Sequence, residues 1–539
     1  MTDLDVAIVG AGFGGMYALH HLRGRGLRCR VFEAGTGVGG TWYWNRYPGA
    51  RVDVESLEYS YSFDTELEQE WEWAERYPAQ PEVLRYLENV AERHDLLRDI
   101  QLDTHIVSMA YDGAWTLTDA RGESVSARYV VAAVGFLSAR HFPPIPGLRE
   151  GTFAGPIVHT GSWPKEGLEL ADRRVGLIGT GASGVQVIPR VAEEAASLRV
   201  YQRSPHWCVP LQNCPMPPDY QRRVKADYPE LRRAELESFS GFVLTNFELP
   251  PPGRRGRREP AFDVDEAERE REYEFRWQAG GLCLYNSFGD LLVSEEANRT
   301  LQDFVARKVR SIVKDPEVAE LLIPKDHPIL SKRLCGESGY YEAFNRENVT
   351  LVNVRGDPIE AITPTGLRVA SGAEHDLDAI ICATGYDAAT GSLLRIDIRG
   401  RDGRTLREHW ARGTRTHLGA MSHGFPNLFF LDGPQAPSAF FLPPIFTQYQ
   451  AEWVGRVIEH MHERGARAVE PTAEAEEGWR RRVNGLAARS LLPRARNQLM
   501  GDNVAGKPRE CLYYLGGYAD YAQRCEQVMA PDQGEFVWA

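Results

Sequence analysis

Short apolar runs that end in glycine recur along the chain, and segments with helical spacing separate them. The runs Val6–Val9 and Val175–Ile178 are each followed by several glycines and then by apolar residues three or four positions apart. Continuous apolar runs of this length are typical of strands buried on both faces, as in parallel sheets. The alternation of such strands with helices predicts an α/β fold.

The first unit predicts a binding site for a dinucleotide. After the first strand, the pattern G-x-G-x-x-G is formed by Gly10, Gly12 and Gly15. A helix over Met16–Arg23 and a strand over residues 28–32 follow, and the strand ends at Glu33, about 20 residues after the first glycine. Glycines let the backbone approach a pyrophosphate at the helix N-terminus, and Glu33 would accept hydrogen bonds from a ribose hydroxyl. The alternative is a glycine-rich turn that binds nothing.

The same order of elements returns after the strand at 175–178. The turn and helix start contain Gly179, Thr180, Gly181, Ser183 and Gly184. The next strand, Ser197–Tyr201, ends at Gln202-Arg203-Ser204 and not at an acid. Arginine pairs with a 2′-phosphate, whereas glutamate repels it, so the second site favours NADPH. Arg203 as a solvated surface residue is the competing interpretation. Two nucleotide sites in one chain predict FAD and NADPH as cofactors.

The rest of the chain completes these two units. Strands ending in glycine turns are expected over 129–135 and 378–387, a long helix over 446–464, and a mostly helical insertion after residue 217 that contains a solvated basic loop at 254–258. We therefore predict two Rossmann-like dinucleotide-binding domains, for FAD and NADP, with a helical insertion. The expected segments are 1–145 and 381–539 for the FAD domain, 150–216 and 326–380 for the NADP domain, and 217–325 for the insertion.

Composition narrows the possible partners and compartments. The 539 residues include 62 basic and 75 acidic side chains, a net charge of −13, which argues against nucleic acid as a partner. The 8 cysteines are scattered without a C-x-x-C pair, which indicates free thiols, no metal site and a reducing compartment. We see no signal-peptide pattern and no apolar run that would span a membrane. A cytoplasmic protein without a membrane partner is expected.

One segment before the second unit narrows the chemistry. Residues 153–164 read FAGPIVHTGSWP, with the pattern positions Phe153, Gly155, His159, Thr160, Trp163 and Pro164. This stretch resembles the fingerprint of the type I Baeyer–Villiger monooxygenases, a class of flavoprotein monooxygenases. The resemblance extends along nearly the whole chain, through residues 39–49, 51–56, 332–333, 340–341, 345–346, 383–387 and 506–509.

The resemblance implies a reaction and residues for it. Family members reduce FAD with NADPH, trap O2 as a C4a-peroxyflavin, and let this peroxide attack a ketone, which becomes an ester or lactone; sulfides are side substrates. The resemblance assigns Arg333 as the fixed cation of the active site and Asp53 as its carboxylate partner. Lys332 would join Arg203 and Ser204 on the 2′-phosphate. Without the resemblance, Arg333 would be interpreted as a surface arginine and Asp53 as a structural cap.

Other positions receive weaker assignments. Gly40, Thr41 and Trp42 are expected beside the flavin, although packing explains aromatic residues equally well. We interpret His159 as a hinge contact and not as a proton-transfer group, and Trp163 as packing.

The C-terminal loop departs from the family pattern, because Asn497-Gln498 stands where many members have Ser-Trp, and Ala505 replaces a proline. Phe440 and Gln498 are the candidate substrate-facing residues. The neighbouring apolar residues favour hydrophobic ketones.

Three other functions compete with this one. An N- or S-oxygenating flavin monooxygenase shares both nucleotide sites, but Thr160, the Trp163-Pro164 pair and the Lys332-Arg333 pair favour the Baeyer–Villiger class. A nucleotide-dependent disulfide reductase needs a closely spaced cysteine pair, which the sequence lacks. A flavoprotein sensor without catalytic activity would use the same scaffold and would not oxidise NADPH.

Overall fold

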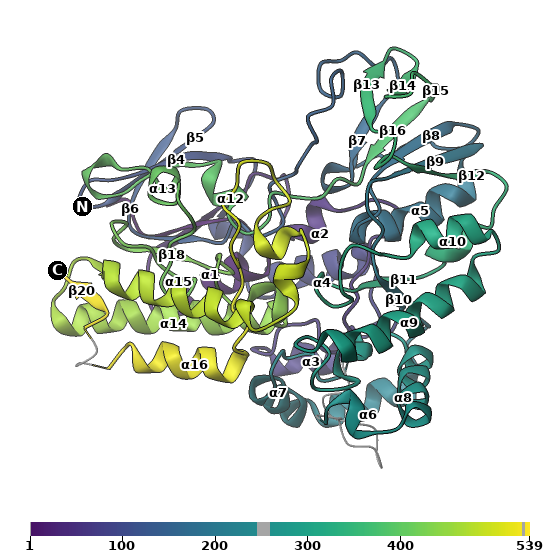
Figure 1. Ribbon diagram of the computed structural model, residues 1–539. Coiled ribbons are helices and arrows are strands. Elements are labelled where there is room, and N and C mark those ends of the chain that lie inside the picture. Colours follow the sequence, from purple (N-terminus) through teal and green to yellow (C-terminus); the bar gives the residue numbers. More distant parts are fainter. Residues whose placement is uncertain (1, 245–258, 531–533) are drawn as a thin grey trace.

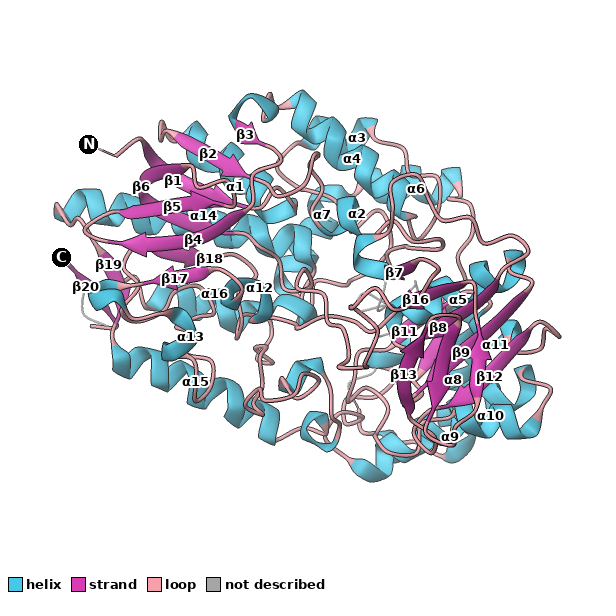
Figure 2. Cartoon of the chain, turned by 90° about the horizontal axis from the view of Figure 1, so that it is seen from above, coloured by secondary structure: helices cyan, strands magenta, loops and turns pink. Residues whose placement is uncertain are grey.

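The chain folds into two lobes, each built on its own sheet. The computed structural model describes residues 2–244, 259–530 and 534–539. Figure 1 shows the larger sheet with α14, α15 and α16 on one side and the second sheet with α5, α9 and α10 on the other, and both termini lie on the first lobe. Figure 2 shows the sheets at opposite ends of the molecule. The basic loop predicted at 254–258 lies outside the described residues.

The first sheet has the order β17-β4-β5-β6-β1-β2-β3, with β18 paired to β6. Its central pairs are parallel, with Ile8 opposite both Val31 and Val131. Burial on both faces explains why β1 and the end of β6 are continuous apolar runs. The strands are β1 (Leu4–Val9), β2 (Cys29–Phe32), β3 (Ile100–Gln101), β4 (Ile106–Tyr111), β5 (Trp115–Asp119), β6 (Ser124–Ala132), β17 (Asp397–Arg399) and β18 (Leu428–Phe430).

The second sheet is parallel throughout, in the order β12-β9-β8-β16-β7. Its strands are β7 (Ile157–His159), β8 (Arg174–Ile178), β9 (Ser197–Gln202), β12 (Val349–Asn353) and β16 (Ala379–Cys382). Smaller sheets pair β10 (Cys208–Pro210) with β11 (Cys335–Glu337), β14 (Gly366–Val369) with β13 (Ile359–Thr363) and β15 (Glu374–Asp376), and β19 (Val469–Pro471) with β20 (Phe536–Trp538).

Helices cover both sheets. The first lobe contains α1 (Phe13–Gly24), α2 (Thr41–Trp44), α3 (Thr65–Glu70), α4 (Gln80–Arg93), α12 (Gly391–Leu394), α13 (Leu406–His409), α14 (Pro443–Arg464), α15 (Ala473–Ala488) and α16 (Tyr518–Gln527). The second contains α5 (Ala182–Glu194) and α11 (Tyr340–Ala343). Helix α1 packs on α14, which confirms the long C-terminal helix and explains how the C-terminal part joins the first lobe. No helix within the described ranges is long and apolar enough to cross a membrane.

The predicted insertion is helical but does not form a body of its own. It contains α6 (Pro218–Ala226), α7 (Tyr228–Glu237), α8 (Glu266–Ala279), α9 (Glu295–Ile312) and α10 (Pro316–Leu322). Tyr228 and Leu231 belong to the core of the first lobe, whereas Trp277 and Phe304 belong to the core of the second. The insertion therefore connects the two lobes.

The α/β architecture with a dinucleotide-type unit in each lobe confirms the predicted fold class. The five segments remain our proposal for the domain division. The pairing of β16 with β7 and β8 moves its last boundary from residue 380 to beyond Cys382, because a boundary within β16 would cut a strand of the second sheet.

Candidate active site

A single continuous cavity of about 1760 Å³ is lined by residues of both lobes. Both glycine-rich turns open onto it, as do the segments around Asp53 and Arg333. Because the carboxyl ends of β1 and β8 both lead into this space, one cavity could hold two nucleotides end to end.

The first glycine turn has the shape that a pyrophosphate requires. Gly10 has φ +104°, and a Cβ there would lie 2.4 Å from the Ala133 carbonyl oxygen. A Cβ on Gly15 would lie 1.8 Å from the Gly10 carbonyl oxygen, so Gly15 allows α1 to pack against the turn. The backbones of Gly12 and Gly40 pass close to each other at the cavity wall. A Cβ on Gly40 would lie 2.8 Å from the Gly12 Cα, so only glycine fits there. This backbone cradle fits FAD.

Glu33 lies at the end of β2 on the same wall. Its carboxylate accepts the backbone N–H groups of Ala11 and Gly35, each at 2.7 Å, and the residue is 5% exposed. Each oxygen keeps a lone pair for a further donor, so the position fits the predicted ribose contact. Thr41 and Trp42 also line the cavity, and the Trp42 Nε1–H is buried without a hydrogen-bond partner among the described residues.

The second glycine turn repeats the first. Gly179 has φ +111°, and a Cβ there would lie 2.4 Å from the Ala383 carbonyl oxygen. A Cβ on Gly184 would lie 2.4 Å from the Gly179 carbonyl oxygen, while Gly181 faces open space. Thr180 and Ser183 line the cavity at the N-terminus of α5, where backbone N–H groups favour an anion. This cradle fits the pyrophosphate of NADP.

Positive charge gathers where the 2′-phosphate of NADP was predicted. Arg203, Ser204 and Lys332 all line the cavity, and the Ser204 carbonyl oxygen accepts the Thr180 hydroxyl at 3.1 Å. Burial lowers the pKa of Lys332, and the charge of Arg203 acts in the same direction. Arg355 also lines this part of the cavity and was missed, because a single arginine after a strand has no distinguishing pattern.

Arg333 and Asp53 form the central ion pair of the cavity. The Arg333 Nη1–H donates to Asp53 Oδ2 at 2.7 Å, and Nη2–H donates to Oδ1, so the pair is bidentate. Burial alone would lower the pKa of Arg333, but the charge and hydrogen bonds of Asp53 outweigh it and raise this pKa. The Asp53 side chain is 9% exposed and that of Arg333 37%. A guanidinium has five N–H groups, so donors remain for a molecule in the cavity.

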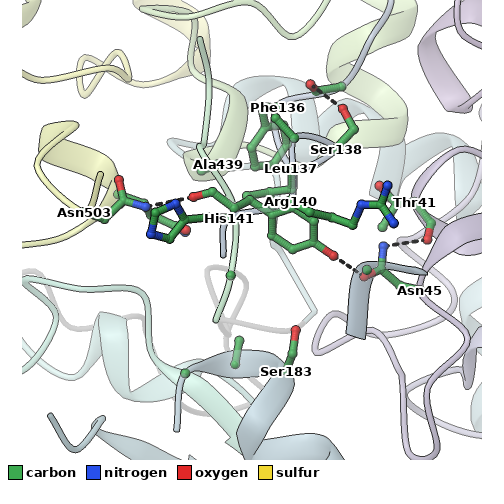
Figure 3. A pocket seen from close by; sticks show the side chains of 18 of the residues that line it. Thr41, Asn45, Phe136, Leu137, Ser138, Arg140, His141, Ser183, Ala439 and Asn503 are labelled. Atoms are coloured by element: carbon green, nitrogen blue, oxygen red, sulfur yellow. Dashed lines mark hydrogen bonds between the residues drawn. The ribbon is translucent and has the colours of Figure 1, made fainter. Parts of the chain in front are cut away.

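Two connections between the lobes lie side by side at the cavity. The chain crosses after β6 and crosses back after β16, where the His141 N–H donates to the Gly385 carbonyl oxygen at 2.9 Å. The Tyr386 hydroxyl donates to Asn45 Oδ1, and the Asn503 side-chain amide donates to the Tyr386 carbonyl oxygen at 2.8 Å. Figure 3 shows the labelled side chains of this region, with Asn45 at one side of the view and His141 and Asn503 at the other.

The fingerprint residues lie beside these connections. Phe153 and Trp163 are buried in cores of the second lobe, and a Cβ on Gly155 would lie 2.4 Å from the Asp378 carbonyl oxygen. His159 ends β7, its Nδ1 accepts the Gly161 N–H at 2.9 Å, and burial lowers its pKa to about 4. Its ring centroid lies 5.8 Å from that of Tyr386, and it is not among the residues that line the cavity. The hinge role of His159 stays a prediction.

Hydrogen bonds attach the C-terminal loop to the rest of the protein at two places. The Asn497 amide donates to the Ser331 carbonyl oxygen at 2.9 Å, and Lys507 Nζ donates to the Ala388 carbonyl oxygen at 2.9 Å. Gln498 lines the cavity, as predicted for a substrate-facing residue. Phe440 does not: its ring packs against Tyr513, and its neighbours Ala439 and Phe441 line the cavity instead, because the 3₁₀ turn at 438–440 rotates it away.

For Gln498→Trp we expect a changed ketone selectivity or a changed release of peroxide, with an unchanged flavin content. An indole in place of the amide fills part of the cavity without touching the first glycine turn. Product analysis on several ketones, peroxide measurement and the flavin absorbance check this. An unchanged substrate profile with unchanged peroxide release would refute it.

Asp432 is a second cavity residue that the sequence did not indicate. It lines the cavity, its Oδ1 is buried without a hydrogen-bond partner among the described residues, and burial raises its pKa to about 7. Because the carboxyl pKa is raised from its ordinary value of 3.8, its contribution to stability is fully present below about pH 4 and falls as the pH rises, until the loss is complete at about 7.

Asp432→Asn should therefore stabilise the protein increasingly as the pH rises from about 4 to about 7, and change stability least at pH 4. We expect a gain of about 1 kcal/mol or more at pH 8, since the amide cannot ionise. Thermal unfolding of both proteins between pH 4 and pH 8 measures this. The pH 4 pair serves as the control, and a difference that does not grow with pH contradicts the expectation.

Known proteins resemble the chain over nearly its full length. Residues 8–64 match the family model described as an NAD(P)-binding Rossmann-like domain. A Baeyer–Villiger monooxygenase of Pseudooceanicola batsensis is 42% identical, with 98% of this chain and 95% of that protein covered. Phenazine N-monooxygenase PhzNO1 of Lysobacter antibioticus is 40% identical, with 99% and 97% covered.

Solved structures agree. An oxidised steroid monooxygenase bound to NADP superposes with a TM-score of 0.91 at 45% identity, with 99% of each chain covered. The OTEMO complex with FAD and NADP superposes with a TM-score of 0.92 at 40% identity, with 100% of each chain covered.

Proposed function

The chain belongs to the Baeyer–Villiger monooxygenases, and from this we propose that it oxidises hydrophobic ketones to esters or lactones at the Arg333–Asp53 pair. Its cofactors are FAD and NADPH, and O2 is the oxidant. The observation that supports this site best is the bidentate ion pair on the wall of the cavity that both glycine turns share. FAD held at the first glycine turn would supply the chemistry of hydride acceptance from NADPH and of O2 activation.

Arg333 supplies a permanent positive charge to the cavity. Negative charge must develop on the reacting oxygens during oxygen insertion, and a guanidinium remains protonated at any working pH. The raised pKa of Arg333 strengthens this property. The donors that Asp53 leaves free can point at a developing oxyanion without a reorganisation of the site.

Asp53 acts through Arg333 and is a positioning residue. It binds both terminal nitrogens, so the plane of the guanidinium is fixed. A Cβ on Gly336 would lie 3.2 Å from the Asp53 Cβ, so the strand that follows Arg333 passes close to the Asp53 side chain. This contact joins the first lobe to β11 at the site.

The substrate class follows from the cavity wall. Apolar and aromatic side chains face the cavity together with the charged pair, among them Val54, Tyr59, Phe242, Phe441 and Leu499. Such a wall favours the transfer of apolar substrates from water and recognises them mainly by shape. We therefore propose hydrophobic ketones as main substrates and thioethers as side substrates.

A ketone panel tests the proposal. Purified enzyme with FAD, NADPH and O2 is incubated with linear, cyclic and aromatic ketones, and the products are identified by mass. Esters or lactones one oxygen heavier than the ketone are expected. NADPH oxidation that yields peroxide alone with every ketone would count against the proposal.

Oxygenation of nitrogen is the second candidate, because one relative of similar identity is named a phenazine N-monooxygenase. A heteroaromatic amine in the same panel distinguishes the two. An N-oxide as the main product, with little ester or lactone, would favour this alternative.

We also propose the cytoplasm as the working compartment. All 8 cysteines are free, and Cys214 is exposed, which suits a reducing environment.

A further inference from the structure

Two cysteines that are far apart in sequence lie side by side at the cavity. Cys208 on β10 is the register partner of Cys335 on β11, in a parallel pair. Both thiols are free, and the residues are 0% and 2% exposed to solvent. Cys335 follows Arg333 by two positions and is itself part of the cavity wall. Cys335 is therefore the member of the pair that adjoins the cavity.

The surroundings make the two thiols unequal. Cys335 Sγ lies 3.7 Å from the His206 Nδ1, and the Cys208 thiol lies 3.5 Å from the His206 carbonyl oxygen. The hydrogen bond from the Cys208 thiol, with the charges of His206 and Arg333, holds the pKa of Cys335 well below its usual range against the opposing effect of burial. Burial raises the pKa of Cys208. This is the arrangement of one thiolate nucleophile and one protonated partner.

The backbone permits a bond between them. Neighbouring strands lie about 4.8 Å apart, and disulfides join Cα atoms about 4.4–6.8 Å apart. The parallel register places Cys208 and Cys335 directly opposite each other, so no shift of one strand along the other is needed.

We propose that Cys335 and Cys208 form a peroxide-reactive dithiol on the cavity wall, a site of reversible oxidation distinct from the ketone reaction. The Cys335 thiolate attacks one oxygen of hydrogen peroxide; an S–O bond forms, the O–O bond breaks, and hydroxide leaves and takes a proton as water. The Cys208 sulfur then attacks the Cys335 sulfur and loses its proton, the S–O bond breaks, and a second water leaves. Two thiols are oxidised to a disulfide, and one peroxide is reduced to two waters.

This proposal rests on the proposed monooxygenase activity only for a source of peroxide inside the cavity. An oxygenase whose cavity activates O2 releases hydrogen peroxide when no substrate accepts the oxygen, and Cys335 lies on the wall of that cavity. Formation of the disulfide removes the thiolate beside Arg333 and constrains the strand that follows it. Oxidation should therefore slow ketone oxidation, and a dithiol reductant should restore it.

Added peroxide tests the pair without NADPH, O2 activation or ketone. The FAD-loaded enzyme is treated with a small excess of hydrogen peroxide, the thiols are blocked, and the peptides are mapped by mass without reduction. We expect a peptide that links Cys208 to Cys335 and a loss of about fivefold or more in labelling of both, reversed by dithiothreitol. Because this arm needs no monooxygenase activity, its result concerns the dithiol alone.

Two variants sharpen the test. In Cys208→Ser the sulfenic acid on Cys335 cannot be resolved, so a sulfenic-acid probe should label Cys335 more strongly than in the unchanged enzyme. Cys29→Ser, which alters a buried thiol on β2, is the matched control and should leave the linked peptide unchanged. Oxidation of the exposed Cys214 with Cys335 and Cys208 still fully labelled would overturn the proposal.

A second experiment, with NADPH and no ketone, tests whether the enzyme itself supplies the peroxide. A linked peptide that forms only after added peroxide would refute that source.

Discussion

Arg333→Ala should lower the rate of ketone oxidation by a factor of about 100 or more. The rate at which NADPH reduces the flavin should stay similar. Among the described residues, the Arg333 guanidinium donates hydrogen bonds only to Asp53, and Arg333 lines the cavity. Removal of the guanidinium leaves Asp53 as an unpaired carboxylate, which repels the developing negative charge and does not stabilise it. Neither glycine turn is touched, so both cofactors should still bind.

Anaerobic flavin reduction and aerobic product analysis separate these two steps. Arg333→Lys keeps the charge but cannot bind both oxygens of Asp53 in one plane, so an intermediate loss of ester is expected. Asp53→Asn places an amide N–H donor against the guanidinium, which is itself a donor. This change should lower the yield of ester or lactone more than it lowers the rate of flavin reduction. Ester formation by Arg333→Ala at a rate close to that of the unchanged enzyme would dismiss the role of this residue.

Arg203→Ala should raise the KM for NADPH by about 10- to 100-fold and leave the KM for NADH within about twofold, because only NADPH carries the 2′-phosphate. Arg203 stands at the cavity after β9, beside Lys332 and Arg355. A charge-assisted hydrogen bond to a phosphate is worth about 1.5–3 kcal/mol, which sets the expected range. The glycine cradle binds the pyrophosphate of either nucleotide and is unaffected.

Steady-state kinetics with both nucleotides measures the ratio. Arg199→Ala is the matched control, since Arg199 lies on the same strand but does not line the cavity. Lys332→Ala should act in the same direction as Arg203→Ala. An equal loss with NADPH and NADH would assign Arg203 to a general structural role and contradict the phosphate contact.

The nucleotide units could be predicted because their signal is local. Strand, glycines, helix and the residue after the next strand follow one another within a short stretch, and the structure places Gly10, Gly12, Glu33, Gly179 and Gly181 on the cavity wall. Gly15 and Gly184 also match the pattern, but they serve helix packing, and a Cβ on either would collide with its own turn. The pattern thus locates the cradle without separating its binding glycines from its packing glycines.

Predictions that depended on side-chain direction were less complete. Phe440 and Phe441 are adjacent and equally apolar, yet only Phe441 lines the cavity. Arg355 and Asp432 lie in no recognisable sequence motif. They could be identified as cavity residues only from the structure, in which they line the cavity together with other segments. For Phe440 and Phe441, the 3₁₀ turn at 438–440 decides which ring faces the cavity, and no periodicity in the sequence encodes that turn.

The sequence by itself determined the α/β class, the two dinucleotide cradles and the family, because each depends on residues close together in the chain. Only the tertiary structure decided which distant residues meet. Cys208 meets Cys335 only because β10 and β11 pair in parallel register. For Asp53 and Arg333, which are 280 positions apart, the family resemblance predicted the pairing, and the structure adds that the ion pair is bidentate and lies on the cavity wall. The insertion was predicted as a helical addition to the NADP domain, but its apolar residues are divided between the cores of both lobes. Such contacts arise when whole helices and strands pack against one another to bury apolar surface. Because this packing depends on residues throughout the chain, it leaves no local pattern in the sequence.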